Sequence, residues 1–273
     1  MSLLDPASRA PRLRPVHRPM PFVTLRVVAA LILREMTSTY GRKPGGYLWA
    51  VLEPVAGIAL LTWIFSLGFR HPALGTDFAM FYASGMIPFW MFIQVSTRMA
   101  QSLRYSRQLL AYPRVTVVDA LVARYLLNVM LQLLIAYIVL GGIRMINDTG
   151  TTLVLPRIAL GFAMAAALAA GVGAFNCVLM TAFPLWQTAW GILTRPLVLM
   201  SGVIFMLETI PEPWRGYLAW NPLTHVVAEV RAGFYFGYHP DYVAPGYVFG
   251  VSLVLLAVGL LLTWRFHREA LEA

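Results

Sequence analysis

Long apolar stretches separated by short charged segments dominate the chain from Tyr47 onward. A helix that crosses a bilayer needs roughly 20 mostly apolar residues, because the hydrocarbon core is about 30 Å thick and each residue rises about 1.5 Å. The uncharged stretch from Ile158 to Thr194 would be about 55 Å long as one helix. It is therefore expected to be two helices, with the turn at Pro184. The pattern predicts an all-α integral membrane protein with six spans, at about 47–69, 78–97, 120–143, 158–182, 185–207 and 247–264.

Two further segments have helical patterns but are not expected to cross the membrane. From Val23 to Tyr40, apolar residues recur at helical spacing among charged ones, which predicts an amphipathic helix lying in the inner interface. The outer segment, from Glu208 to Pro245, contains a short helix with Asn221 as its N-cap and Pro222 at its first position.

The first 21 residues differ from the rest of the chain. They are rich in Arg and Pro and have no apolar core, which is unlike a cleavable signal peptide. We expect residues 1–21 to be a disordered cytoplasmic tail and residues 22–273 to form one transmembrane domain.

Composition supports an integral membrane protein. Of the residues, 59% are hydrophobic and 12% are charged, about half the charged fraction of a soluble domain. The net charge of +9 does not indicate a nucleic-acid partner, because the basic residues do not gather on one stripe. Most of the Lys and Arg residues fall on the side that holds the N-terminus, and this bias predicts that both termini are cytoplasmic.

The chain lacks the residues for ATP hydrolysis through a P-loop. Such a loop requires Gly-Lys followed by Ser or Thr, whereas Lys43, the only lysine, stands between Arg42 and Pro44. Cys177 is the only cysteine, which excludes a Cys-based metal cluster. His225 and Glu229 have metal-ligand spacing without a third ligand, so a hydrogen bond along the helix face is favoured. We expect no catalytic residue, no metal and no cofactor on this chain.

Several polar side chains fall inside predicted spans, where they are energetically costly and usually paired or functional. Glu53 could form an ion pair with arginines of the amphipathic helix, with Arg124 or with Arg195, or it could carry protons. Arg124, Asn128 and Gln132 are spaced four apart and form one stripe, which could line a polar conduit or bind neighbouring helices.

Arg98, Arg104 and Arg107 lie ahead of Pro113 in the cytoplasmic segment that runs from Arg98 to Asp119. The segment is long enough for one or two helical turns outside the membrane. It could be a docking element for a separate ATPase, or its charges could simply reflect the positive-inside rule.

Three motifs together resemble one family. They are Arg34-Glu35-Met36 leading to Gly46-Tyr47-Leu48-Trp49-Ala50-Val51-Leu52-Glu53-Pro54; Gly85-Met86-Ile87-Pro88-Phe89-Trp90; and Asn221-Pro222-Leu223-Thr224-His225 followed by Glu229, Arg231 and Gly233-Phe234-Tyr235. Over residues 22–268 the chain resembles the permease subunit of type-2 ABC transporters that export polysaccharide. The Leu-Glu-Pro sequence is more similar to the capsule-export branch than to the O-antigen branch.

The resemblance implies an inner-membrane homodimer bound to two copies of an ATPase subunit, which holds ATP and Mg. It implies a lipid-linked, acidic polysaccharide as substrate, a periplasmic adaptor and an outer-membrane exporter as partners, and no nucleic acid. Export of O-antigen or another lipid-linked glycan is the alternative within the family. A proton-coupled secondary transporter using Glu53 is the alternative outside it.

This function assigns roles to the candidate residues. A polyanion favours positive charge at the entrance of its path, and the predicted path comprises Arg34, Arg42, Lys43, Glu53, Arg124, Asn128, Gln132 and Arg195. Docking of the ATPase is assigned to Arg98, Arg104 and Arg107. In the outer segment, aromatic rings could stack on sugars or form an ordinary interfacial belt; its candidates are Trp214, Trp220, His225, Glu229 and Arg231.

Overall fold

The computed structural model describes residues 23–39, 46–106, 116–147 and 149–272. Within these ranges the fold is all helical, as predicted. The helices are α1 (Val23–Thr39), α2 (Gly46–Gly68), α3 (Phe78–Ala100), α4 (Ser102–Ser106), α5 (Val117–Ile146), α6 (Leu155–Ala182), α7 (Pro184–Met200), the 3-10 helix η2 (Leu207–Thr209), α8 (Trp214–Ala219), α9 (Pro222–Phe234) and α10 (Pro245–Glu272).

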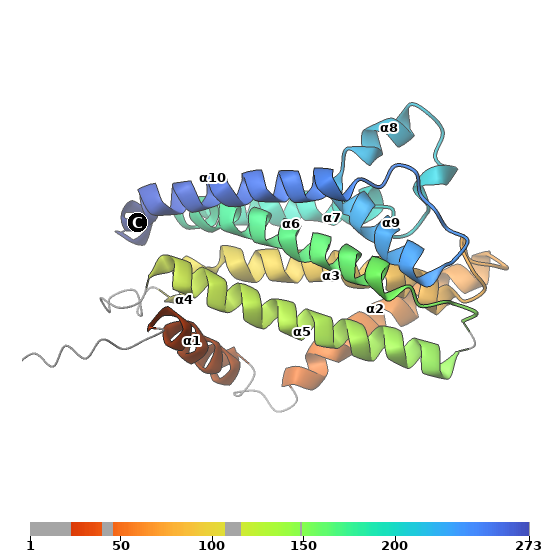
Figure 1. Ribbon diagram of the computed structural model, residues 1–273, viewed down its shortest axis with the longest axis horizontal. Coiled ribbons are helices and arrows are strands. Elements are labelled where there is room, and N and C mark those ends of the chain that lie inside the picture. The colour runs from red at the N-terminus through yellow and green to blue at the C-terminus, as the bar shows by residue number, and fades with distance from the viewer. Residues whose placement is uncertain (1–22, 40–45, 107–115, 148, 273) are drawn as a thin grey trace, which may run out of the picture.

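The long helices form one elongated bundle (Figure 1). Helix α1, helix α4 and the C-terminal part of α10 lie at one end of it, which we call the α1 end. Helices α8 and α9 lie at the opposite end, the α9 end. The last described residues of the chain are therefore at the same end as the amphipathic helix.

Five helices are long and apolar enough to cross a membrane: α2, α3, α5, α6 and α10. The predicted fifth span, 185–207, is shorter than expected, because α7 ends at Met200. Its 17 residues reach about 25 Å, less than the hydrocarbon core. In Figure 1, α7 nevertheless returns from the end where α6 stops to the end that holds α8 and α9. The count of six spans stays a prediction that depends on α7.

The early end of α7 has a physical reason. Gly202 has a φ of 68°, a left-handed conformation that glycine adopts readily and that a helix does not contain. The carbonyl groups of Gly202 and Val203 accept hydrogen bonds from Arg231 instead of from later residues of a helix. Residues 201–206 therefore form a connecting segment folded around a buried guanidinium.

Helices α3 and α6 form the core of the bundle. They pack on one another, and α6 also packs along α10 and α9. Gly161 and Gly173 of α6 allow close approach, because an added Cβ would lie 2.4 Å from Val230 of α9 and 2.8 Å from Met99 of α3. Helices α2, α7 and α10 expose most of their apolar residues, as expected for helices that face lipid or another subunit.

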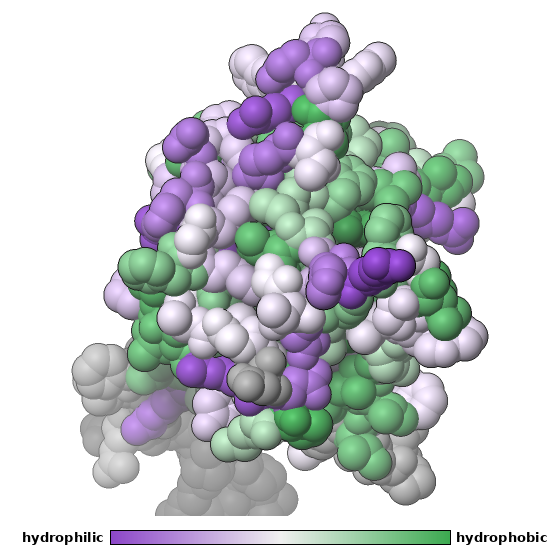
Figure 2. Space-filling view, turned by 90° about the vertical axis from the view of Figure 1, so that its right-hand side faces the viewer, coloured by the Kyte–Doolittle hydropathy of each residue, from purple (hydrophilic) through white to green (hydrophobic). Residues whose placement is uncertain are grey.

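The α9 end of the bundle carries hydrophilic residues among hydrophobic ones (Figure 2). Figure 2 looks onto the α9 end, where hydrophilic and hydrophobic residues share the face and hydrophilic ones gather over the projecting α8 segment. Trp214 and Trp220 lie in or beside that segment, and both are exposed.

Candidate functional site: a junction at the α1 end

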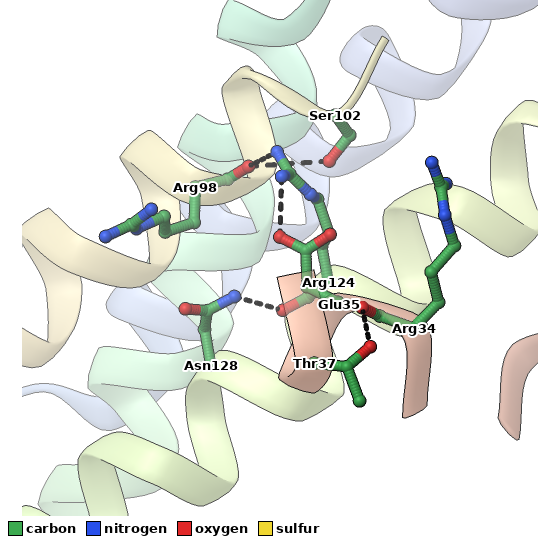
Figure 3. Close-up of polar contacts among 7 residues, drawn as sticks. All are labelled: Arg34, Glu35, Thr37, Arg98, Ser102, Arg124 and Asn128. Atoms are coloured by element: carbon green, nitrogen blue, oxygen red, sulfur yellow. Dashed lines mark hydrogen bonds and ion pairs between the residues drawn. The ribbon is translucent and has the colours of Figure 1, made fainter. Parts of the chain in front are cut away.

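The buried side chain of Arg124 joins three segments at the α1 end (Figure 3). From α5, its Nη2 atom lies 2.6 Å from Oε1 of Glu35 on α1. Its Nη1 atom donates to the backbone oxygen of Arg98, near the end of α3, over 3.1 Å. Its guanidinium carbon lies 4.3 Å from the centre of the Tyr105 ring on α4. We call Arg124, Glu35, Arg98 and Tyr105 the α1 junction.

The environment of this ion pair makes it hard to break. The side chain of Arg124 is 4% exposed and that of Glu35 is 21% exposed. Removing one partner of a buried pair leaves an uncompensated charge, at a penalty of about 3–5 kcal/mol. Loss of Glu35 would therefore leave the buried Arg124 guanidinium without its counter-ion.

The start of α5 is fixed by its own cap. The Thr116 hydroxyl accepts from the backbone N–H of Asp119, and the Asp119 carboxylate accepts from the backbone N–H of Thr116. This reciprocal capping box satisfies two backbone donors. It fixes the start of α5 and thereby the direction in which the Arg124 side chain projects, about two turns later.

The predicted polar stripe on α5 is divided between two sites. Asn128 donates to the backbone oxygen of Arg124 over 2.7 Å, within α5. Gln132 instead lines a pocket with Glu53 of α2 and with Trp90 and Gln94 of α3. Because Arg124 pairs with Glu35, Arg124 is excluded as the partner of Glu53, which was one of the alternatives that the sequence left open.

The pocket at Glu53 has a volume of about 20 Å³, room for about one water molecule. The Trp90 ring packs on Gly57 of α2, where an added Cβ would approach it to 2.6 Å. Glu53 itself is exposed on the surface of this single chain. Neither an ion pair nor a hydrogen bond of its carboxylate is present within the described ranges.

The remaining basic candidates are spread around the α1 end and the bundle surface. Arg34 and Arg195 are exposed. Arg104 of α4 donates to Oε1 of Gln187 on α7 over 2.8 Å, which links the predicted docking segment to a helix that the sequence did not connect with it. Arg42, Lys43 and Arg107 lie outside the described residues.

Arg231 is the main structural residue of the α9 end. It is 2% exposed; its guanidinium donates to the carbonyl groups of Gly202, Val203 and Phe205 and lies 4.2 Å from the Phe81 ring centre. Gly85 leaves the necessary space, since an added Cβ would lie 2.8 Å from Nη2 of Arg231. These contacts assign Arg231 a packing role.

The expected hydrogen bond between His225 and Glu229 is wrong. His225 Nε2 lies 2.7 Å from the carbonyl oxygen of Ala219, and its Nδ1 accepts from the backbone N–H of Ala244 over 3.1 Å. The ring therefore connects α8, α9 and the start of α10. Burial lowers the pKa of His225, and burial raises the pKa of Glu229 while Arg157 opposes that rise. Within the described residues, no three His, Cys, Asp or Glu side chains form a metal-binding group.

Sequence reasoning missed Glu35 and Tyr105 as partners of Arg124. The available signal was that Glu35 is the only acid of α1 and that an arginine inside a span needs a partner. Helical spacing alone could not show that α1 lies against α5, because contacts between distant segments depend on how the helices pack.

Comparison with known proteins agrees with this architecture. The sequence profile of the ABC-2 type transporters matches residues 26–235. The polysialic acid transport protein KpsM of Escherichia coli is 32% identical over 244 residues, which are 89% of this chain and 94% of KpsM. The capsule polysaccharide export inner-membrane proteins CtrC of Neisseria meningitidis serogroup B and BexB of Haemophilus influenzae are 28% and 25% identical over 251 residues, 89% of this chain and 92% of each relative.

The family match covers both the α1 junction and the α9 end, so it includes the elements that distinguish this fold from a simple helix bundle. Members of this family are permeases whose ATP-hydrolysing subunit is a separate protein, as the absence of a P-loop lysine predicts. The chain is a membrane-spanning permease subunit of the ABC-2 type transporter family.

Proposed function

We propose that this chain is the transmembrane subunit of an ATP-driven exporter that moves lipid-linked, acidic capsular polysaccharide across the bacterial inner membrane. The observation that carries the proposal is the similarity to KpsM, CtrC and BexB over 89% of the chain. All three are named for polysaccharide or capsule transport, and two are named as inner-membrane proteins.

In the proposed machine, the ATPase subunits dock at the α1 end, on α4 and the residues that follow it. Movement of α4 would reach α5 through the stacking of Tyr105 on Arg124 and α1 through the pair of Arg124 with Glu35. It would reach α7 through the bond of Arg104 to Gln187. Because Arg124 binds both neighbours, the junction would move α1 and α5 as one unit.

We place the conduit between two copies of the chain. Helices α2 and α7 expose charged residues, Glu53 and Arg195, on otherwise apolar surfaces. Charges within a span rarely face lipid, which argues for a second copy or an aqueous path beside these helices. In this arrangement both termini are cytoplasmic, and the α9 end delivers the glycan to the periplasmic adaptor and the outer-membrane exporter.

The experiment is to express tagged chain with its neighbouring genes, purify it in detergent and measure ATPase activity and composition. The proposal predicts two ATPase subunits and two permease chains per complex, with activity stimulated by an acidic lipid-linked polysaccharide. A chain that purifies alone and transports protons or solute in vesicles without ATP would contradict it and favour the proton-coupled alternative.

A further inference from the structure

A groove of about 280 Å³ runs along the bundle surface between α5, the first turns of α6 and the end of α9. Its walls are almost wholly apolar and include Leu133 and Leu140 of α5, Ile158 and Phe162 of α6, and Phe234 of α9. Helix α6 packs extensively on α3 and α10 but makes few contacts with α5. The groove is the space left open between α5 and α6, because these two helices contact each other at few points.

The length of the groove matches one leaflet of a bilayer. Its lining on α5 extends from Leu133 to Arg144, a rise of about 16 Å along the helix. Half of the hydrocarbon core is about 15 Å thick. Leu133 is near the middle of α5 and Arg144 is in its last turn, so the groove runs from mid-depth of the membrane to the interface at the α9 end.

A single charged residue lies at the interfacial end of this groove. Arg144 is exposed, and its guanidinium has no hydrogen bond or ion pair with the part of the chain that the structure describes. A second groove of about 540 Å³, between α2 and the opposite side of α5, has no charged residue among its lining residues. The two grooves thus have similar walls and differ in charge.

We propose that the Arg144 groove is a binding site for one anionic phospholipid of the surrounding bilayer. Its phosphate binds the Arg144 guanidinium, and one acyl chain lies along α5 against Ile158 and Phe162. The lipid fills the gap between α5 and α6 and contacts Phe234, the last residue of α9. This inference is independent of the transported substrate.

Native mass spectrometry of the full-length chain in detergent tests the proposal. The probes are phosphatidylglycerol and phosphatidylcholine with identical acyl chains, each titrated against wild type and variants. Wild type is expected to bind phosphatidylglycerol more tightly. Arg144→Gln should weaken phosphatidylglycerol binding by about fivefold, the usual contribution of one basic residue to anionic lipid binding. Phosphatidylcholine binding should weaken less, because the choline group already neutralises the phosphate charge.

Two adjacent glycines provide a matched pair of groove-filling variants. Gly141 lines the Arg144 groove and Gly142 lines the uncharged one, and an added Cβ at either meets no atom within 4 Å. Gly141→Phe should lower the binding of both lipids at the Arg144 site, while Gly142→Phe should keep the preference for phosphatidylglycerol. Arg70→Gln, at an exposed arginine two residues after the end of α2, controls for total charge.

Three results would overturn the proposal. One is equal binding of both lipids by wild type, and another is a preference that survives in Arg144→Gln and Gly141→Phe. The third is a co-purified lipid that carries sugars and is lost in Gly141→Phe, which would assign the groove to the transport substrate. None of these results depends on whether the chain exports capsular polysaccharide.

Discussion

Two buried arginines, one at each end of the bundle, have similar surroundings and different kinds of partner. Arg124 and Arg231 each lie over an aromatic ring, at 4.3 and 4.2 Å, and each leaves its Nε without a hydrogen bond among the described residues. Arg231 binds carbonyl groups of one connecting segment, whereas Arg124 binds a carboxylate on α1 and the backbone at the end of α3.

The difference in partners implies different roles for Arg231 and Arg124. A guanidinium that binds one segment of backbone holds that segment in place, so Arg231 is expected to act on stability alone. A guanidinium that connects separate helices makes them move together, so Arg124 is expected to act on coupling as well. Substituting each arginine or its partner tests this difference.

The largest effect is expected from Arg231→Met. This variant leaves buried carbonyl groups without donors, at about 1–3 kcal/mol for each, and the loss of several kcal/mol would unfold the α9 end. Detergent-solubilised protein should show a sharply lower melting temperature and yield. Arg231→Lys should recover part of the loss, because an ammonium can still donate to these carbonyl groups. A melting temperature unchanged in Arg231→Met would contradict the packing role.

A smaller loss of stability is expected from Glu35→Gln. The variant leaves the Arg124 charge buried without its counter-ion, and because Glu35 is partly exposed the loss should be at or below about 3 kcal/mol. Thermal unfolding in detergent measures it. The double variant Glu35→Gln with Arg124→Gln should be less destabilised than the two single losses added together, since the pair is coupled. Strict additivity would show that the ion pair contributes nothing.

The stability of the α9 end should also depend on pH through His225. Burial lowers the pKa of this ring, so the unfolded chain takes up the proton more readily than the folded chain. Stability from the neutral ring is therefore present above the unfolded pKa of about 6.5 and is lost as pH falls toward the lower folded pKa. Melting temperatures at pH 7.5 and 5.5 should differ less in His225→Gln than in wild type; an equal difference would exclude His225 as the cause.

The smallest effect on stability is expected from Arg104→Gln. The bond of Arg104 to Gln187 is exposed, and exposed interactions of this kind contribute about 0–1 kcal/mol. The complex should assemble normally and export less polysaccharide, because α4 would lose its link to α7. Surface polysaccharide measured against total polysaccharide in cells tests this, with Gln187→Ala as the matching variant. Unimpaired export in both would contradict a transmitting role for this contact.

Most of the fold was predictable from apolar length and charge. The boundaries of α2 and α3 agree with the predicted spans to within three residues, because an uninterrupted apolar run has few alternatives in a membrane. The end of α7 was not predictable, since residues 201–207 are as apolar as a helix interior. Residues 201–206 are not helical, because carbonyl groups in this segment accept hydrogen bonds from Arg231, which lies 26 to 29 positions later in the chain.

The candidate site was predicted less well than the fold. Helical spacing correctly placed Arg124 and Asn128 on one face, but it could not show which neighbour that face contacts. Glu53 is nearer to Arg124 in sequence than Glu35 is, and yet α1 rather than α2 approaches Arg124. The predicted hydrogen bond of His225 with Glu229 was wrong for the same reason, because the partners of His225, Ala219 and Ala244, lie outside its own helix.

The most direct test of the central claim, that the α1 junction couples ATP hydrolysis to export, is capsule export by Glu35→Gln in cells at a growth temperature where the variant stays folded. The matched control is Thr37→Ala, an exposed α1 residue whose hydroxyl donates to the backbone oxygen of Arg34 within the same helix. We predict that Glu35→Gln keeps the ATPase bound and active while surface polysaccharide is lost, with Thr37→Ala unaffected. Export at the wild-type level by an intact Glu35→Gln complex would contradict the account.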